Sequence, residues 1–196
     1  MTSPIALRGQ EVRRRLLRAA VELIPERGWS AVSTRLLAER AGVTPGVVHY
    51  HFSSVRELLS QAALGTMREM LSGVHALFEQ ARSATDAVDT MLAALEEYSG
   101  RDPASMVFTE TYLAATRDDD LRHAMTEIVA DFRRRFADAL ARWRVPDPAG
   151  TAAVVAATID GILLHRGLDP GLTAASIGPV LRRLVPDAKT VEEDAG

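Results

Sequence analysis

Apolar residues recur every three or four positions along almost the whole sequence, and this repeat is the feature that most limits the possible folds. In the first such segment, Val12, Leu16, Ala20 and Leu23 fall on one face of an α-helix, with arginines on the other face. The repeat is interrupted by glycine and proline, and no segment shows the alternation that is typical of a strand. The sequence therefore predicts an all-α fold of about nine helices.

The interruptions set the expected helix limits. The first helix ends at Arg27-Gly28, Ser33 is the expected N-cap of a second helix that ends at Gly42, and Thr44-Pro45 begin a third. The other helices are expected over residues 55–82, 85–99, 103–116, 118–143, 149–166 and 172–184. We interpret the acidic triplet 118–120 as a helix cap and not as a metal site. The acidic tail, 187–196, is expected to be disordered.

Charge is distributed unevenly along the chain. Residues 1–60 contain nine arginines and five acidic residues, a balance of +4, whereas the remainder has 14 basic and 21 acidic residues, a balance of -7. This pattern is typical of a head that binds a polyanion, joined to a body that binds a ligand or partner. An arginine-rich surface helix would give the same count, so charge alone does not decide the function.

Several classes of protein fit the sequence poorly. The absence of cysteine excludes disulfides, thiolate metal sites and cysteine nucleophiles. No glycine-rich phosphate loop, metal-ligand spacing or Ser/His/Asp motif indicates an enzyme, and no cofactor is expected. The N-terminus has no signal-peptide stretch, and the longest apolar run, 152–164, is interrupted by Asp160 and too short to span a bilayer. We therefore expect a cytoplasmic protein with no membrane partner.

The most informative segment is 33–59, in which two short helices are joined by a tight glycine turn. This is the geometry of a helix-turn-helix, whose second helix enters the major groove of double-stranded DNA. Leu37, Ala38 and Ala41 are small or apolar where the two helices must cross closely, and Gly42 turns the chain. The first amides of the second helix and the Thr44 hydroxyl are placed to bond phosphate oxygens.

Residues 9–60 resemble the tetracycline-repressor (TetR) family of transcriptional regulators. The resemblance rests on Gly28-Trp29, Ser33, the run 38–44, Gly46 and His51-Phe52. It implies a domain boundary near residue 54, with a helix-turn-helix domain over 1–54 and a ligand-binding and dimerisation domain over 55–186.

The resemblance also implies which residues touch DNA: Arg35, Thr44, Pro45, Gly46, Val47, His49, Tyr50 and Arg56. Two positions depart from the family pattern. His49 stands where a phosphate-binding tyrosine is common, and Val55 stands where a lysine is common, with Arg56 beside it as a substitute. Tyr50 has two interpretations, a DNA contact or an edge of the small core. His49 and His51 point to different helix faces and cannot chelate one ion.

Beyond residue 60 the segment 159–165 resembles the C-terminal domain of betaine-pathway repressors. The resemblance implies a homodimer on a palindromic operator, formed through a bundle of residues 149–166 with either 119–143 or 172–184. The alternative is that the alanine-rich helix 149–166 is the central core helix of the body. Asp160 has three interpretations: a ligand contact, a partner across the dimer for Arg133 or Arg134, or an acid that faces solvent.

A pocket for a small-molecule effector is expected among the helices of residues 55–116 and the bundle. Its candidate lining residues are Met67, Met70, Phe78, Met91, Leu95, Tyr98, Met106, Phe108, Tyr112, Asp160 and His165. Methionine and aromatic residues at helical spacing are more often plain core, so about half of these are expected to reach a cavity. Glu97, Thr109 and Glu110 could add polar contacts.

The sequence as a whole predicts a sequence-specific DNA-binding regulator, a repressor that a small molecule releases from its operator. The alternatives are an enzyme, and a helical ligand-binding or adaptor protein whose helix-turn-helix no longer reads DNA. Whether the regulator represses or activates is not decided by the sequence.

Overall fold

The computed structural model describes residues 4–186, and within this range the chain forms helices, turns and loops without a strand. The elements are α1 (Pro4–Arg27), η1 (Trp29–Ala31), α2 (Thr34–Ala41), α3 (Pro45–His51), α4 (Val55–Gln80), α5 (Ala84–Leu95), α6 (Pro103–Ala115), α7 (Asp119–Arg142), α8 (Pro148–Arg166) and α9 (Ala174–Arg182). The predicted all-α fold is confirmed. The tail expected to be disordered, 187–196, lies outside the described residues.

Most helix limits agree with those expected from the sequence, and α5 and α9 are shorter. α5 ends at Leu95 instead of residue 99, because the following residues form turns that lead to Gly100 at φ +75°. α9 begins at Ala174 because Thr173 and Ser176 form a capping box there, each side chain accepting from the other residue's backbone N–H. Both differences arise where side chains or turns outside the helix take over the terminal backbone groups.

The described chain packs as two compact units. The first contains residues up to 68 together with 106–125, and the second contains 69–105 together with the residues after 125. α4, α6 and α7 each contribute residues to both units. The first unit therefore extends beyond the 1–54 segment expected to form the DNA-binding domain.

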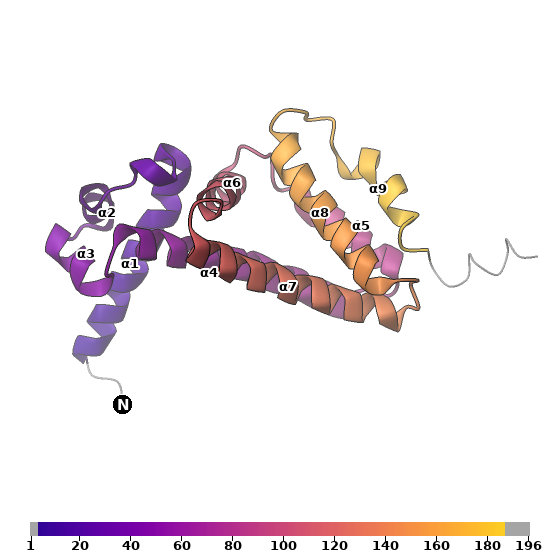
Figure 1. Cartoon of the computed structure of the whole chain (residues 1–196), viewed down its shortest axis with the longest axis horizontal. Helices are drawn as coiled ribbons and strands as arrows, with labels where there is room; N and C mark the ends of the chain where they lie inside the picture. Colours follow the sequence, from indigo (N-terminus) through magenta and orange to yellow (C-terminus); the bar gives the residue numbers. More distant parts are fainter. Residues whose placement is uncertain (1–3, 187–196) are drawn as a thin grey trace, which may run out of the picture. The chain divides into compact units, whose positions relative to one another are not determined.

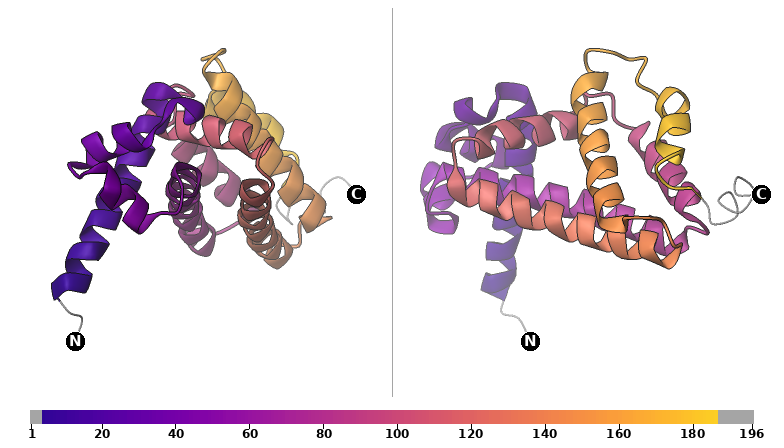
Figure 2. Two further views of the ribbon diagram at one scale, coloured as in Figure 1. Left: turned by 60° about the vertical axis from the view of Figure 1, so that its left-hand side comes forward. Right: turned by 45° about the vertical axis from the view of Figure 1, so that its right-hand side comes forward.

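The core of the first unit lies among α1, α2, α3 and the start of α4, and α1–α3 are the indigo-to-purple helices of Figures 1 and 2. Leu16 and Ala20 from α1 meet Leu37 from α2 and Phe52 after α3, all of them buried. Val107 of α6 joins the same cluster. The apolar stripe of α1 thus fixes the short helices, which are too short to be stable by themselves.

The core of the second unit joins α4, α5, α7, α8 and α9. Phe78 of α4 stacks on Phe136 of α7, with ring centroids 4.8 Å apart. Val88 of α5 and Val155 of α8 are fully buried in the same cluster. α8 is also long and apolar enough to cross a membrane, with a mean hydropathy of 1.3, but core helices of soluble proteins meet the same criterion.

Candidate nucleic-acid interface

The turn between α2 and α3 is built by local hydrogen bonds. The Ser33 hydroxyl accepts from the Leu36 backbone N–H at 3.4 Å, which confirms Ser33 as the N-cap of α2. Gly42 adopts a left-handed conformation with φ 66°, and the Val43 N–H then donates to the Ala38 carbonyl at 2.9 Å. This 6→1 hydrogen bond closes the helix as in a Schellman motif, which favours glycine at position 42.

α3 presents most of its side chains to solvent. Val48 is its one buried residue and anchors the helix to the core. Pro45, Gly46, His49 and Tyr50 are exposed, and Val47 is half-buried. Tyr50 has 85% of its surface exposed, so it does not lie at the edge of the core, which was one of its two interpretations. A helix anchored on one side with an open opposite face has the geometry of a reading helix.

At the start of α3, the Thr44 side chain and the helix backbone are accessible. Thr44 is the N-cap residue, but its side chain makes no capping hydrogen bond, and it is exposed. Pro45 occupies the first turn, where a missing N–H is not needed. A Cβ atom built on Gly46 would meet nothing within 4 Å, so the backbone of α3 is open to approach at this point.

Some arginines of the first unit are held by partners within the described part of the protein, and others are not. Arg40 binds Glu22 at 3.2 Å and Glu26 at 2.6 Å, and its hydrogen bond lowers the pKa of the Glu26 carboxyl. Arg13 lies over the Phe52 ring at 4.8 Å and donates to Gln61. Arg35 is exposed in the first turn of α2 and has no ion-pair partner within residues 4–186. The charge available to a polyanion is therefore smaller than the count of nine arginines indicates.

Arg56 lies at the edge of a groove between the starts of α4 and α7. Its Nε is 3.6 Å from a carboxylate oxygen of Asp118, and 67% of its side chain stays exposed. Asp118 also accepts from the Leu121 N–H at 3.1 Å, which confirms the interpretation of the acidic triplet as a helix cap. The groove has a volume of about 350 Å³ and is lined by Ser53, Ser54, Arg56, Glu57, Ser60, Gln61, Leu64, Asp118, Asp120 and Leu121. None of the expected effector residues lines it.

Glu110 has a contact that the sequence did not indicate. Its carboxylate accepts from the Trp29 backbone N–H at 2.7 Å and lies over Gly28, which has φ +81°. The sequence does not indicate this contact, because the amide partner of Glu110 lies 81 positions away, and Glu110 is instead expected among the pocket residues. Gly28-Trp29 was the only signal in the sequence for this backbone geometry. Val107, one helical turn before Glu110, is buried in the core of the first unit, so this face of α6 supports α1–α3, the helices that form the reading head.

The expected effector residues are divided between the two units. Met67, Met106, Phe108 and Tyr112 belong to the first unit. In the second, Phe78, Met91 and Leu95 are buried core residues, Met70, Tyr98 and Asp160 are half-buried, and His165 is exposed. Tyr112 is also exposed. The effector role of these eleven residues stays a prediction.

Two buried polar atoms of the second unit have no hydrogen-bond partner in the described chain, His75 Nε2 and Arg133 Nε. His75 stacks on Phe132 with ring centroids 6.2 Å apart, and burial lowers the pKa of its imidazole. Burial raises the pKa of Asp160, and the charge of Arg133 opposes this shift. Asp160 is half-buried, and its three interpretations stay predictions. The sequence does not indicate His75 or Arg133 as a ligand contact, because each occupies an ordinary position of a helical repeat.

A capped helix, a glycine turn and an exposed second helix define a DNA-binding protein of the helix-turn-helix class. A family model described as bacterial regulatory proteins, tetR family, matches residues 16–62. A second, described as tetracyclin repressor-like, C-terminal domain, matches residues 82–187, which is more than half of the chain. The chain belongs to the tetracycline-repressor (TetR) family of transcriptional regulators. The finer resemblance to betaine-pathway repressors stays a prediction.

Individual relatives agree with this assignment. An uncharacterized HTH-type transcriptional regulator of Mycobacterium tuberculosis, Rv2912c, is 23% identical over 83% of this chain and 86% of its own. The crystal structure of the putative transcriptional regulator SCO7518 from Streptomyces coelicolor A3(2) is similar with a TM-score of 0.76, 27% identity and coverage of 89% of this chain and 98% of that one. The multidrug binding protein EbrR, solved with malachite green, has a TM-score of 0.65 and 25% identity over 89% of this chain and 98% of its own.

Proposed function

We propose that this chain is a dimeric repressor that reads a two-fold operator with α3 and leaves it when a small molecule binds the body. The observation that carries the DNA-reading part is the exposed face of α3, with Tyr50 at 85% exposure beside the open backbone of Gly46. A bulky aromatic that is exposed on an anchored helix is suited to a contact in the major groove. We assign DNA reading to residues 1–54 and effector binding and dimerisation to 55–186, in the cytoplasm and without catalysis.

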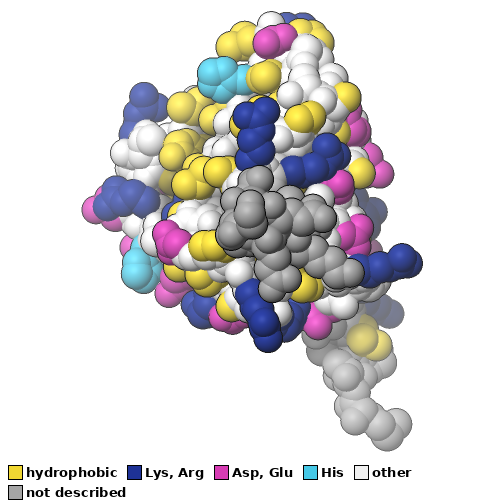
Figure 3. Space-filling view, turned by 90° about the vertical axis from the view of Figure 1, so that its right-hand side faces the viewer, with side chains coloured by type: hydrophobic (Ala, Val, Ile, Leu, Met, Phe, Trp, Pro, Cys, Tyr) yellow, Lys and Arg dark blue, Asp and Glu magenta, His cyan; other side chains and the backbone are white. Residues whose placement is uncertain are grey.

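The dimer part of the proposal is supported by the outer side of α8 and α9. Val154 is 51% exposed and Leu168, just after α8, is 83% exposed, although both are large and apolar. Figure 3 shows the side of the second unit that contains α9, where hydrophobic side chains are exposed among scattered charged ones. Exposed apolar side chains along neighbouring helices favour burial against a partner. A second copy of the chain would also supply the second reading helix that a two-fold operator needs.

The effector part is supported by the unpartnered polar atoms of the second unit. Buried groups such as Arg133 Nε and His75 Nε2 cost free energy unless something accepts or donates a hydrogen bond there. EbrR, a structural relative, was solved with malachite green bound. α4 belongs to both units, so a shift of its second half is carried along a continuous helix to the reading head. Operator DNA must then weaken effector binding by the same factor by which the effector weakens DNA binding.

The test is selection of binding duplexes from a random pool, followed by titration of the selected duplex and of a scrambled one at physiological salt. Tyr50→Ala is the informative variant, and Tyr112→Ala is its control, because Tyr112 is an exposed tyrosine on α6. We expect Tyr50→Ala to lose affinity for the selected duplex while Tyr112→Ala retains it. Equal binding of selected and scrambled duplexes would support the adaptor alternative. A reporter gene behind the selected duplex distinguishes repression from activation.

A further inference from the structure

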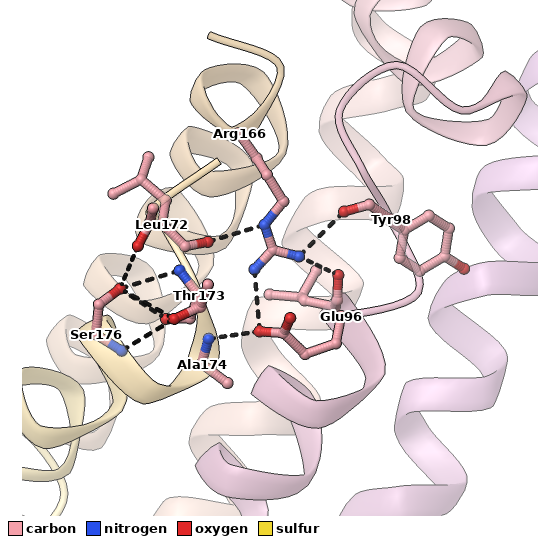
Figure 4. Close-up of polar contacts among 9 residues, drawn as sticks. Glu96, Tyr98, Arg166, Leu172, Thr173, Ala174 and Ser176 are labelled. Carbon is pink, nitrogen blue, oxygen red and sulfur yellow. Dashed lines mark hydrogen bonds and ion pairs between the residues drawn. The ribbon is translucent and has the colours of Figure 1, made fainter. Parts of the chain in front are cut away.

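Arg166, the last residue of α8, is a buried arginine whose guanidinium group makes four polar contacts. Only 8% of its surface is exposed. Its Nε donates to the Leu172 carbonyl at 2.8 Å, and one Nη donates to the carbonyls of Leu95 and Tyr98, the latter at 3.0 Å. The other Nη is 3.3 Å from Glu96 Oε1 (Figure 4). A guanidinium group removed from water requires such partners for its fixed fork of donors.

These bonds join the end of α8 to the distant end of α5 and to the loop that follows α8. The carbonyls of Leu95 and Tyr98 lie at the C-terminal end of α5, where a cation is electrostatically favoured. The Leu172 carbonyl lies in the loop that leads to α9. Glu96, the acidic partner of Arg166, also accepts from the Ala174 N–H at the first residue of α9. Arg166 and Glu96 together therefore fix the start of α9 to the end of α5 (Figure 4).

Backbone packing at the same place leaves little freedom for α8 to shift. A Cβ atom on Gly100 would lie 2.4 Å from the Gly167 backbone nitrogen, so the two backbones are in direct contact. Arg101 Nε donates to the Gly167 carbonyl at 3.0 Å. Gly100 has φ +75°, which also favours glycine. The end of α8 is thus held from both sides, and the start of α9 is held at the same junction through the Ala174 N–H.

Exposed apolar residues lie next to this junction on α8 and farther along the chain on α9. Leu164 and Leu168 lie two residues before and two residues after Arg166, and Val180 of α9 is 55% exposed. The one acidic residue of α8, Asp160, is not among its exposed residues. The exposed charged residues nearest to these apolar residues in the sequence, Asp169 and Arg182, have opposite signs, so a second copy of this surface is not repelled by charge of one sign.

We propose that Arg166 is a positioning residue of the dimer interface: it fixes the 167–173 loop and α9 so that α8 and α9 present one apolar surface to a second copy of the chain. The inference rests on the dimer of the proposed function. Leu95 and Tyr98, whose carbonyls Arg166 holds, are also expected effector residues. The same guanidinium group therefore links the end of α5 to the dimer surface.

The test compares Arg166→Met with Arg182→Met in the full-length chain. Arg182 is the matched control because it also joins α9 to α5, through Asp89 at 2.8 Å, but this pair is 46% and 40% exposed. Sedimentation velocity over a dilution series gives the dimer dissociation constant, and circular dichroism gives the helical content. We expect that constant to rise about tenfold or more for Arg166→Met, and less than about fivefold for Arg182→Met, as for an exposed ion pair.

A merely structural role would give a different result. It would lower the melting temperature of Arg166→Met and leave the dissociation constant unchanged at temperatures where the protein is folded; that result would overturn the inference. If Arg166→Met does not fold, Glu96→Ala decides, because it removes the α9 contact and leaves the three carbonyl bonds of Arg166 in place. A folded Glu96→Ala protein with wild-type dimer affinity then refutes the proposal, and a several-fold rise supports it. A wild-type chain that is monomeric at every concentration would contradict the dimer of the proposed function itself.

Discussion

Gly46→Ala separates DNA binding from folding, because the structure predicts opposite effects on the two. A Cβ atom at Gly46 would meet nothing within 4 Å, and the residue lies in the first turn of α3 without a positive φ. Alanine has the higher helix propensity, so the variant should be more stable by about 0.5–1 kcal/mol. In a chain of this size that corresponds to a rise of about 1–4 °C in melting temperature. Any loss of function therefore cannot come from unfolding.

The expected loss is in operator affinity. If the DNA backbone or a base edge packs against the bare Cα atom of Gly46, an added methyl group that is not accommodated costs about 1–3 kcal/mol. This corresponds to a dissociation constant about 5-fold to 150-fold higher, measured by fluorescence anisotropy with the selected duplex. Gly73→Ala on α4 is the control, because its Cβ atom would also meet nothing within 4 Å. Wild-type affinity of Gly46→Ala would refute the close approach of DNA to α3 at this position.

Three further substitutions test other parts of the account. Arg35→Ala should weaken DNA binding and reduce the slope of log affinity against log salt by about 1, and an unchanged slope would remove Arg35 from the phosphate contacts. Glu110→Ala removes the charged acceptor of the Trp29 N–H and should lower the free energy of unfolding by about 1–2 kcal/mol, against less than about 0.5 kcal/mol for the exposed Glu97→Ala. Burial lowers the pKa of His75 below its ordinary 6.5, so the folded state binds fewer protons than the unfolded state and loses stability as the pH falls through about 6.5. His75→Leu should remove this part of the acid sensitivity in urea unfolding from about pH 7.5 to 5.5; a difference from the wild type that does not change with pH would contradict it.

The features that the sequence predicted well are those in which residue and partner are close along the chain. Ser33 caps an amide three residues later, and Gly42 closes α2 through bonds to residues of the same turn. Pro45, Gly46 and His49, which were expected to touch DNA, are exposed on the short helix α3. Local propensity and periodicity contain this information, so the reading head could be described from its residues.

The features that the sequence did not predict depend on long-range contacts. Arg166 reads as an ordinary basic residue at a helix C-terminus, but its carbonyl partners at Leu95 and Tyr98 lie 71 and 68 positions away. The contact of Glu110 with the Trp29 N–H is not predictable, because periodicity shows which residues share a face and not what that face packs against. The candidate effector residues were chosen by type, and methionine and aromatic side chains such as Phe78 serve equally well as core.

The central claim is that two copies of this chain read one two-fold operator through α3. The most direct measurement is the mass of the complex between the full-length protein and the selected duplex, by light scattering or sedimentation equilibrium at physiological salt. The account predicts two chains on a duplex whose half-sites lie one helical turn apart, about 34–36 Å from centre to centre. It also predicts that a duplex with one half-site destroyed binds far more weakly. A single chain on the duplex, with affinity that is unchanged when one half-site is destroyed, would contradict it.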